Sequence, residues 1–419
     1  MDVRAYCRIP KYLKKSVRAK EGSCPELLYD LFSELEGASE IHIAAYLFNN
    51  PTYFNFLSGL AKKGCKVFIT SLPIRGYSDK ELKVEGYEKK VSGRSLAEEV
   101  YNAINETENM ELFIFPHQYS WYGALYAGGG ASYSFHVKSI FAKFPENKNK
   151  CILSSGNFMV SDPPHSENMI VIENNPEYES VYSMFFNELE KLAIPFKDFQ
   201  NNYSEYKDEF LYQFSDKIVD LPSKGFKNCF FTAPFYCYDG KGSNHFAGDR
   251  IIELISNAKK RVWICAQHFH DLVSFDTERE TIIGAIYKKY LDCPDLEFRF
   301  LKQVPHSSLA DKRRAAIAET LFQFEIKAEQ RYNNLIHDKF IIVDDTLIVS
   351  TANYTSTQFA YGKRRMEYKE GKDKFRKDDI FSEVNGFIIL NNCPKKVMRT
   401  YEQHFNALWN QGVDIKINL

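Results

Sequence analysis

The chain has 419 residues, of which 44% are hydrophobic and 26% are charged, and its formal net charge at pH 7 is −1. This composition is typical of a globular protein and excludes collagen-like and disordered chains. The length suits two or three domains, and the near-zero charge means that any affinity for phosphate groups must come from local basic patches.

The nine cysteines include no C-x-x-C pair, which favours free thiols in a reducing compartment over a disulfide framework. The N-terminus has no apolar signal segment. Nowhere does the chain run through about 18 consecutive apolar residues, so no membrane span is expected. We therefore expect a cytoplasmic protein.

In chain order, the elements of the first half recur in the second half. Helical apolar spacing at 26–32 is followed by an apolar strand at 41–48, and the same succession occurs at 250–255 and 262–269. Further strands are expected at 64–70 and 295–301. Buried strands separated by helices predict two α/β lobes.

The next matching block carries polar side chains. His136 and Lys138, two residues apart in an expected strand, share one face because side chains alternate along a strand. His337 and Lys339 repeat this pair in the second half. A neighbouring strand then returns in each half and brings an asparagine towards the pair. The two returning segments are Ser154-Ser155-Gly156-Asn157 and Ser350-Thr351-Ala352-Asn353.

A third block ends each half. The strand and turn at 168–176 parallel 385–394, and a helix with aromatic residues at helical spacing follows both times. The polar stretch between the halves predicts a first lobe at 1–200, a linker at 201–225 and a second lobe at 226–419.

Two imidazoles, two ammonium groups and two amides brought together can cleave a phosphodiester. One neutral histidine attacks phosphorus, the other donates a proton to the leaving oxygen, and the lysines and asparagines hold the non-bridging oxygens. This chemistry requires neither a metal nor another cofactor. Because both half-sites lie in one chain, a monomer could form the complete site.

These residues resemble the phospholipase D superfamily, whose motif is HxKxxxxD followed by a GSxN-like turn. The second half matches the motif through Asp344, whereas the first half has Lys143 at the aspartate position. The resemblance implies an α/β fold of two pseudo-symmetric lobes, each a mixed β-sheet flanked by helices, with the active site at their interface. It also implies that His136 is the nucleophile and His337 the general acid.

Further residues are expected to support this site. Asp344 is a structural support in the family pattern, and Ser155 and Thr351 lie in the returning turns. A nucleophilic histidine is normally oriented by a carboxylate. Glu167 is the candidate in the first half, and Glu383 or Glu367 in the second. Aligning Asn168 with Asn385 leaves Glu383 one residue out of register.

The substrate is suggested by a basic run that follows Asn353. Its candidate substrate-binding residues are Lys363, Arg364, Arg365, Lys372, Lys374, Arg376 and Lys377. Such a run near a phosphoryl site favours nucleic acid, because contacts to backbone phosphates supply most nonspecific affinity. Resemblance to two-motif bacterial nucleases implies a role in restriction or phage defence, with a helicase or a defence-system protein as partner.

The leading hypothesis is thus a metal-independent nuclease that cleaves DNA or RNA through a covalent phosphohistidine. One alternative is a phospholipid hydrolase or transphosphatidylase of the same superfamily. Another is a catalytically idle subunit that binds nucleic acid. End-processing enzymes such as the tyrosyl-DNA phosphodiesterases lack the motif aspartate, as the first half does, but the complete second motif fits them poorly.

Overall fold

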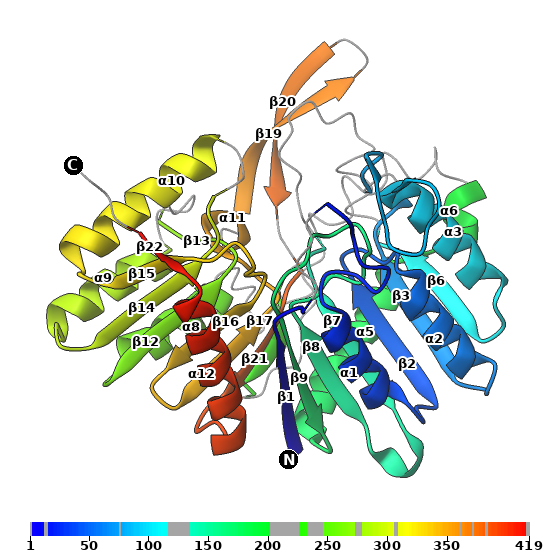
Figure 1. Ribbon diagram of the computed structural model, residues 1–419, viewed down its shortest axis with the longest axis horizontal. Helices are drawn as coiled ribbons and strands as arrows, with labels where there is room; N and C mark the ends of the chain where they lie inside the picture. Colours follow the sequence, from blue (N-terminus) through cyan, green and yellow to red (C-terminus); the bar gives the residue numbers. More distant parts are fainter. Residues whose placement is uncertain are drawn as a thin grey trace.

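The computed structural model describes residues 2–11, 16–74, 77–115, 135–201, 226–232, 246–272, 279–305, 309–359, 362–370, 373–381 and 384–415. Two lobes stand side by side (Figure 1), and each is built on an eight-stranded mixed sheet. The expected α/β fold is therefore confirmed. Nearly all of the expected linker, at 202–225, lies outside the described residues.

The sheet of the first lobe has a seven-residue strand at one edge and a two-residue strand at the other. In order across the sheet, its strands are β1 (Asp2–Arg8), β9 (Glu167–Glu173), β8 (Lys150–Ser154), β7 (Lys138–Lys143), β2 (Glu40–Ala45), β3 (Lys66–Ser71), β6 (Met110–Ile114) and β10 (Ile194–Pro195). β2, β3 and β6 are parallel to one another, and the remaining pairs are antiparallel.

The second sheet repeats this topology strand for strand. Its order is β11 (Cys229–Phe231), β21 (Gly386–Leu390), β17 (Thr346–Ser350), β16 (Lys339–Val343), β12 (Arg261–Ala266), β14 (Glu297–Lys302), β15 (Glu329–Tyr332) and β22 (Val413–Asp414). β12, β14 and β15 are the parallel strands. The central strands are buried on both faces, which explains why their sequences are continuous β-branched and aromatic runs rather than alternating ones.

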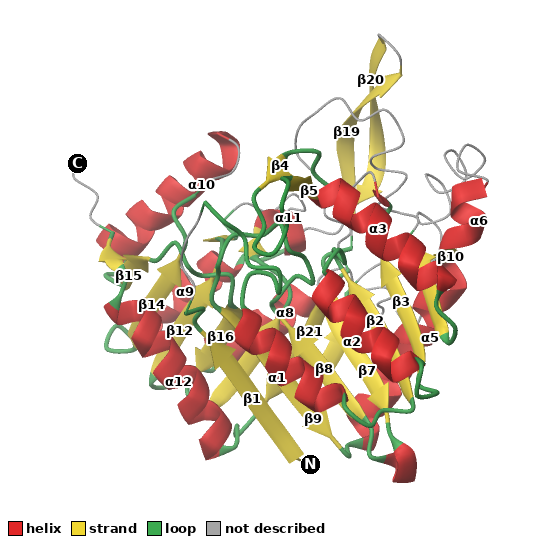
Figure 2. Cartoon of the chain, turned by 45° about the vertical axis from the view of Figure 1, so that its right-hand side comes forward, coloured by secondary structure: helices red, strands yellow, loops and turns green. Residues whose placement is uncertain are grey.

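Helices cover the two sheets (Figure 2). The first lobe has α1 (Pro25–Leu35), α2 (Pro51–Ala61), α3 (Gly93–Glu106), α5 (Pro176–Leu192) and α6 (Phe196–Asn201), and the second has α8 (Phe246–Ser256), α9 (Ile282–Asp292), α10 (Leu309–Thr320) and α12 (Lys395–Asn410). Local sequence sets their starts: α5, for example, begins with Pro176 after the side chain of Asn175 accepts bonds from the backbone N–H groups of Glu177 and Tyr178.

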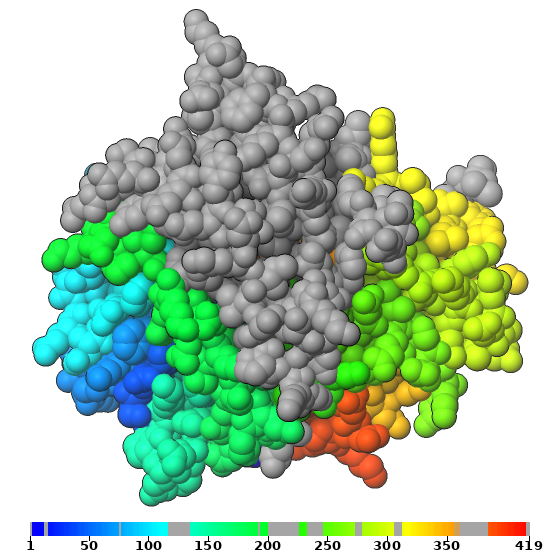
Figure 3. Space-filling view, turned by 180° about the vertical axis from the view of Figure 1, so that it is seen from behind, coloured from blue at the N-terminus to red at the C-terminus, as the bar shows by residue number. Residues whose placement is uncertain are grey.

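The aromatic helix that ends each half also connects the lobes. α5 of the first lobe packs against β11 of the second, where the rings of Phe185 and Phe231 stack with centroids 3.7 Å apart. On α12, the hydroxyl of Tyr401 donates to Asn168 of the first lobe at 3.3 Å. One hydrophobic core includes buried residues of both lobes, although from behind the lobes occupy opposite sides of the molecule (Figure 3).

The lobes pack so closely at one interface position, Gly386, that there is no room for a side chain. A side chain at Gly386 would bring its Cβ within 2.6 Å of Leu153 of the other lobe and 3.0 Å of the Phe231 ring. The lobes are therefore fitted to one another at the level of single methyl groups.

Beyond the two sheets, the second lobe carries an extra two-stranded antiparallel ribbon formed by β19 (Gly362–Glu370) and β20 (Asp373–Phe381). It rises between the lobes and projects away from the sheets (Figures 1 and 2). Smaller elements are β4 (Glu81–Leu82), β5 (Val91–Ser92), β13 (Phe269–His270), β18 (Tyr354–Thr355) and α11 (Ser356–Phe359).

The described cysteines are free thiols, as expected. Among the described residues, no helix is long and apolar enough to cross a membrane.

The stacking of Phe231 on α5 predicts a large contribution to stability. Phe231 is 1% exposed, and Phe231→Ala is expected to lower the free energy of unfolding by about 3–5 kcal/mol, because it leaves a cavity at the lobe interface. Urea unfolding measures this, with Leu291→Ala, at a side chain that is 61% exposed, as the control. A loss of about 0.5 kcal/mol or less for Phe231→Ala would contradict the packing described.

Candidate active site at the lobe interface

The two motif histidines lie where the lobes meet. Each precedes its strand, because β7 begins at Lys138 and β16 at Lys339, rather than lying within the strand as expected. At that point the backbone hydrogen-bonds to the other lobe. The N–H of His136 donates to the carbonyl of Val384 at 3.0 Å, and the N–H of His337 donates to that of Ser166 at 3.2 Å. The histidines are thus positioned by reciprocal bonds between the lobes.

The motif lysines are completely buried. Lys138 and Lys339 are both 0% exposed, and each Nζ donates to the carbonyl of its own histidine, at 2.8 Å and 2.7 Å. Burial lowers the pKa of Lys339 to about 8, although Glu167 and Asp338 act against the shift. An ammonium group has three donors, so two buried lysines at the lobe interface are suited to receive the oxygens of an anion.

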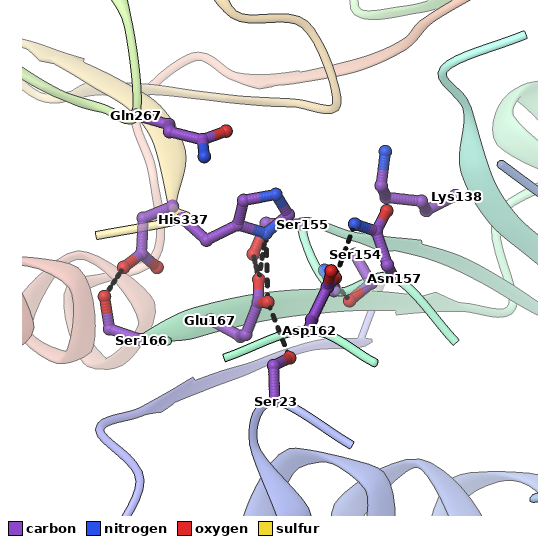
Figure 4. Close-up of polar contacts among 12 residues, drawn as sticks. Ser23, Lys138, Ser154, Ser155, Asn157, Asp162, Ser166, Glu167, Gln267 and His337 are labelled. Atoms are coloured by element: carbon purple, nitrogen blue, oxygen red, sulfur yellow. Dashed lines mark hydrogen bonds and ion pairs between the residues drawn. The ribbon is translucent and has the colours of Figure 1, made fainter. Parts of the chain in front are cut away.

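His337 contacts a carboxylate from the first lobe. Its Nδ1 lies 2.9 Å and 3.0 Å from the two carboxylate oxygens of Glu167. The same oxygens accept bonds from the hydroxyls of Ser23 at 3.0 Å and Ser155 at 2.6 Å (Figure 4). Burial raises the pKa of Glu167 to about 7. The carboxylate expected to orient a histidine is therefore present, but it orients the histidine of the opposite lobe.

His136 contacts an amide at the corresponding place. Its Nδ1 lies 3.4 Å from Oδ1 of Asn385, which also accepts the hydroxyl of Thr351 at 3.0 Å. Burial, followed by the charges of Lys138 and Lys339, holds the pKa of His136 well below its usual range.

The strand pairings correct the alignment of the two halves. Ser154 pairs with Met169, and Ser350 pairs with Phe387. Glu167 and Asn385 each lie two residues before the paired residue, so Glu167, and not Asn168, corresponds to Asn385. Hydrogen bonds agree: the hydroxyl of Ser155 or Thr351 donates to this side chain and accepts the next backbone N–H. The expected alignment of Asn168 with Asn385 was wrong by one residue. In both halves an asparagine comes two residues before an apolar residue, and this similarity favours the wrong alignment.

The second-half carboxylate candidates do not occupy this position. Glu383 lies outside the described residues. The backbone of Glu367 lies in β19, paired with Arg376 of β20, and so belongs to the ribbon rather than to the sheet that carries Asn385.

The two asparagines have different neighbours. Nδ2 of Asn157 donates to Asp162 at 2.9 Å (Figure 4), and burial raises the pKa of this carboxyl to about 6. Asn353 follows β17 and is 8% exposed. Among the described residues, Oδ1 of neither Asn157 nor Asn353 has a hydrogen-bond partner, so both amides retain capacity for a ligand.

Asp344 lies at the other end of β16, away from the histidine. Its carboxylate accepts the backbone N–H groups of Lys259, Lys260 and Arg261 at 2.7–3.0 Å and so holds the start of β12. In the first lobe, Lys143 instead pairs with Glu40 at 2.5 Å. The motif aspartate is thus structural in this chain, and its replacement in the first lobe leaves the site intact.

Three residues of the site are not predicted by the sequence pattern. The ring of His165 stacks on His337 with centroids 5.4 Å apart and an interplanar angle of 19°. Tyr46 lies 5.2 Å from His136 and beneath the ammonium of Lys138. Asp338, inside the motif, accepts bonds from Ser166 at 2.5 Å, Asn168 at 2.9 Å and His404 at 3.1 Å. The sequence offered one indication for two of them: His165 lies two residues before Glu167, and Asp338 lies between His337 and Lys339 of the motif.

The basic residues expected to bind substrate lie on the ribbon. Lys363, Arg364 and Arg365 are in β19, and Lys374, Arg376 and Lys377 are in β20, whereas Lys372 lies outside the described residues. The ribbon is inserted between Asn353 and Asn385, which both belong to the site. The first lobe joins Asn157 to Glu167 without such an insertion.

Comparisons with known proteins agree with this architecture. A family model described as the PLD-like domain of cardiolipin synthase matches residues 251–368. Phosphatidylserine synthase from Haemophilus influenzae Rd KW20 has a similar fold, with a TM-score of 0.52 and 11% identity over 92% of this chain and 84% of the synthase. The matched segment, which contains His337 and Lys339, is thus similar to a domain of the phospholipase D superfamily.

A polyphosphate kinase from Porphyromonas gingivalis also has this fold, with a TM-score of 0.50 and 11% identity over 97% of this chain. The chain spans about half the length of that kinase, since the match covers 50% of it. No curated protein matches the sequence. At these identities the structural likeness establishes the fold alone.

The stacking of His165 on His337 predicts a positioning role for its ring. His165→Ala is expected to lower the rate of phosphodiester cleavage by up to about tenfold, because a stacked pair contributes about 0.5–1.5 kcal/mol. His165→Phe keeps a ring and is expected to keep most of the rate. Steady-state kinetics of the two variants tests this. Equal losses in both would show that the ring nitrogens of His165 are needed instead.

Proposed function

We propose that this chain is a metal-independent nuclease that cleaves DNA or RNA through a covalent phosphohistidine. The proposal is carried by one observation: two buried histidine–lysine pairs meet at the lobe interface, each histidine with its Nδ1 against a side chain of the opposite lobe. A histidine held through Nδ1 directs Nε2 outward, where it can attack phosphorus or donate a proton.

The catalytic residues of the proposal come in two matching sets. They are His136, Lys138 and Asn157 from the first lobe and His337, Lys339 and Asn353 from the second. The buried lysines stabilise the charge that develops on the non-bridging oxygens in a water-poor site, where such interactions are strongest. Glu167, Ser155 and Thr351 orient the groups that react, and Asp344 supports the second-lobe sheet.

The choice of nucleic acid over lipid is supported by the ribbon. Strands β19 and β20 each have nine residues, which corresponds to a length of about 30 Å, and a two-stranded ribbon fits the major groove of a duplex. The register places acids opposite Arg364, Arg365 and Arg376, whereas Lys369 and Lys374 are opposite one another. Lys363 pairs with Ile380 and Lys377 with Met366, so basic residues without an acid opposite occur along the length of the ribbon, whereas the pair at its tip is Glu370 with Asp373.

A phospholipid substrate is the second candidate, favoured by the description of the matching family model. A groove for acyl chains would be needed near the site. The cavity behind Glu167, lined partly by Leu27, Leu28 and Met169, has a volume of about 30 Å³. It has room for about one water molecule and not for an acyl chain.

The function is tested by cleavage of end-labelled single- and double-stranded DNA and RNA in EDTA, beside a fluorescent phosphatidylcholine. Wild type is expected to cleave nucleic acid, and His136→Ala and His337→Ala are each expected to lose at least about 10²-fold in rate, because proton transfer or nucleophilic attack is removed. Loss of wild-type activity in EDTA would contradict metal-free chemistry. Turnover of the lipid alone would place the chain with the phospholipases.

The ribbon makes a separate prediction for binding. Replacing Lys372, Lys374, Arg376 and Lys377 with glutamine should weaken binding and flatten the dependence of log Kd on log salt by about 0.9 for each phosphate that is no longer neutralised. Titrations of the catalytically dead His337→Ala protein, with and without these changes, measure the slope. Lys62→Gln with Lys63→Gln is the control, since both residues are exposed and precede β3, at the end of the central strands opposite the motif. An unchanged slope would remove the ribbon from the substrate path.

A further inference from the structure

We propose that His337 of the second lobe is the nucleophile and that His136 of the first lobe is the general acid. This order is the reverse of the one that the family resemblance implies, and it rests on the proposed phosphodiesterase function. The observation that carries it is the difference between two equivalent positions: Glu167 faces Nδ1 of His337, and Asn385 faces Nδ1 of His136.

The contact with Glu167 determines which nitrogen of His337 reacts. An ionised carboxylate only accepts hydrogen bonds, so Nδ1 of His337 carries the proton at 2.9–3.0 Å and Nε2 carries the lone pair. The carboxylate is itself fixed by the hydroxyls of Ser23 and Ser155. When Nε2 bonds to phosphorus, the ring becomes positively charged, and the adjacent buried carboxylate stabilises that charge.

Asn385 offers His136 a different environment. Its Oδ1 accepts the Thr351 hydroxyl at 3.0 Å and lies 3.4 Å from Nδ1 of His136. An amide oxygen orients an imidazolium without adding negative charge, so a protonated His136 gives up its Nε2 proton readily. The charges of the nearby Lys138 and Lys339 also lower the pKa of His136. The negative charge of a bound phosphodiester opposes them, so His136 keeps its proton until the leaving oxygen takes it.

The reaction then runs in two balanced steps. Nε2 of His337 forms a bond to phosphorus while the bond from phosphorus to the leaving oxygen breaks, and that oxygen takes the proton from Nε2 of His136. A water then attacks phosphorus and gives its proton to the now neutral Nε2 of His136. The bond from phosphorus to His337 breaks, and its electron pair returns to Nε2.

A pH profile separates this role of Glu167 from a purely structural one. Burial raises the pKa of Glu167 to about 7, so its carboxylate form, which activates His337, is lost as the pH falls below that value. The acid limb of kcat/KM should lie near pH 7 in wild type and disappear in Glu167→Gln. The other titratable or charged groups around Glu167 are Lys339, His165, Asp338, Asp162 and Cys24.

The decisive experiment locates the covalent adduct with bis(4-nitrophenyl) phosphate, whose leaving group needs no proton. In His136→Ala, the first step should proceed and the second should stall, which gives a burst of about one equivalent of nitrophenolate. After an alkaline quench and tryptic digestion, the added mass should lie on the peptide 332–339, which contains His337. His337→Ala should give neither burst nor adduct. The peptide 95–138 contains His136 and reports the opposite order.

Two near-isosteric variants, each made in the His136→Ala background where the second step stalls, serve as a matched pair. Glu167→Gln keeps the shape of the side chain and removes its charge, and it should slow the burst by about 10²-fold or more, because the correct tautomer is no longer enforced. Asn385→Asp changes the position equivalent to Glu167, beside the replaced His136, and should still place the adduct on His337, with a burst rate within about tenfold of His136→Ala alone.

Each other outcome is informative. An adduct on 95–138 in His337→Ala, with none on 332–339 in His136→Ala, would overturn the assignment and leave the phosphodiesterase proposal standing. Nitrophenolate release by wild type without an adduct in any variant would overturn the covalent mechanism, and the assignment with it. If wild type neither releases nitrophenolate from this diester nor cleaves any nucleic acid, the proposed function itself is overturned.

Discussion

The hydrogen bond between Glu167 of the first lobe and His337 of the second is the interaction on which the site depends. A buried carboxylate that has lost its water must find its partners within the protein, and here those partners come from both lobes. The histidine is fixed in turn by its backbone bond to Ser166. Neither lobe alone contains a complete environment for either motif histidine, so docking of the lobes and formation of the site are the same event.

Several independent contacts hold the lobes in that register. Asp338 is fully buried between His404 and the Ser166–Asn168 segment. Burial alone would raise the pKa of its carboxyl, but His404 and the two donors from the first lobe reverse the direction and lower it. The stacked aromatic rings of α5 and β11 add apolar burial at the same interface. A shift between the lobes would break charged, polar and apolar contacts together, which keeps the histidines in place.

The site is asymmetric although its scaffold is symmetric. The two sheets share one strand order, and the lysines make the same bond to the preceding carbonyl in both lobes. The differences lie at equivalent positions: Glu167 against Asn385, Asn168 against Gly386, and Lys143 against Asp344. Under the proposed two-step mechanism the two histidines need opposite protonation states, and these differences give each histidine its own surroundings.

The sequence by itself determined the duplicated α/β fold, the His-x-Lys pairs and the returning asparagines. These depend on local periodicity and on residue types within a few positions of one another, and β8, β16 and β17 lie where the pattern predicts them. The tertiary structure alone decided which carboxylate serves which histidine. Glu167 and His337 are 170 residues apart, and no local pattern encodes a contact between lobes. Aligning Asn168 with Asn385 pairs Glu167 with Val384 instead of Asn385, and only the strand pairing, which fixes side-chain position one residue at a time, corrects this shift.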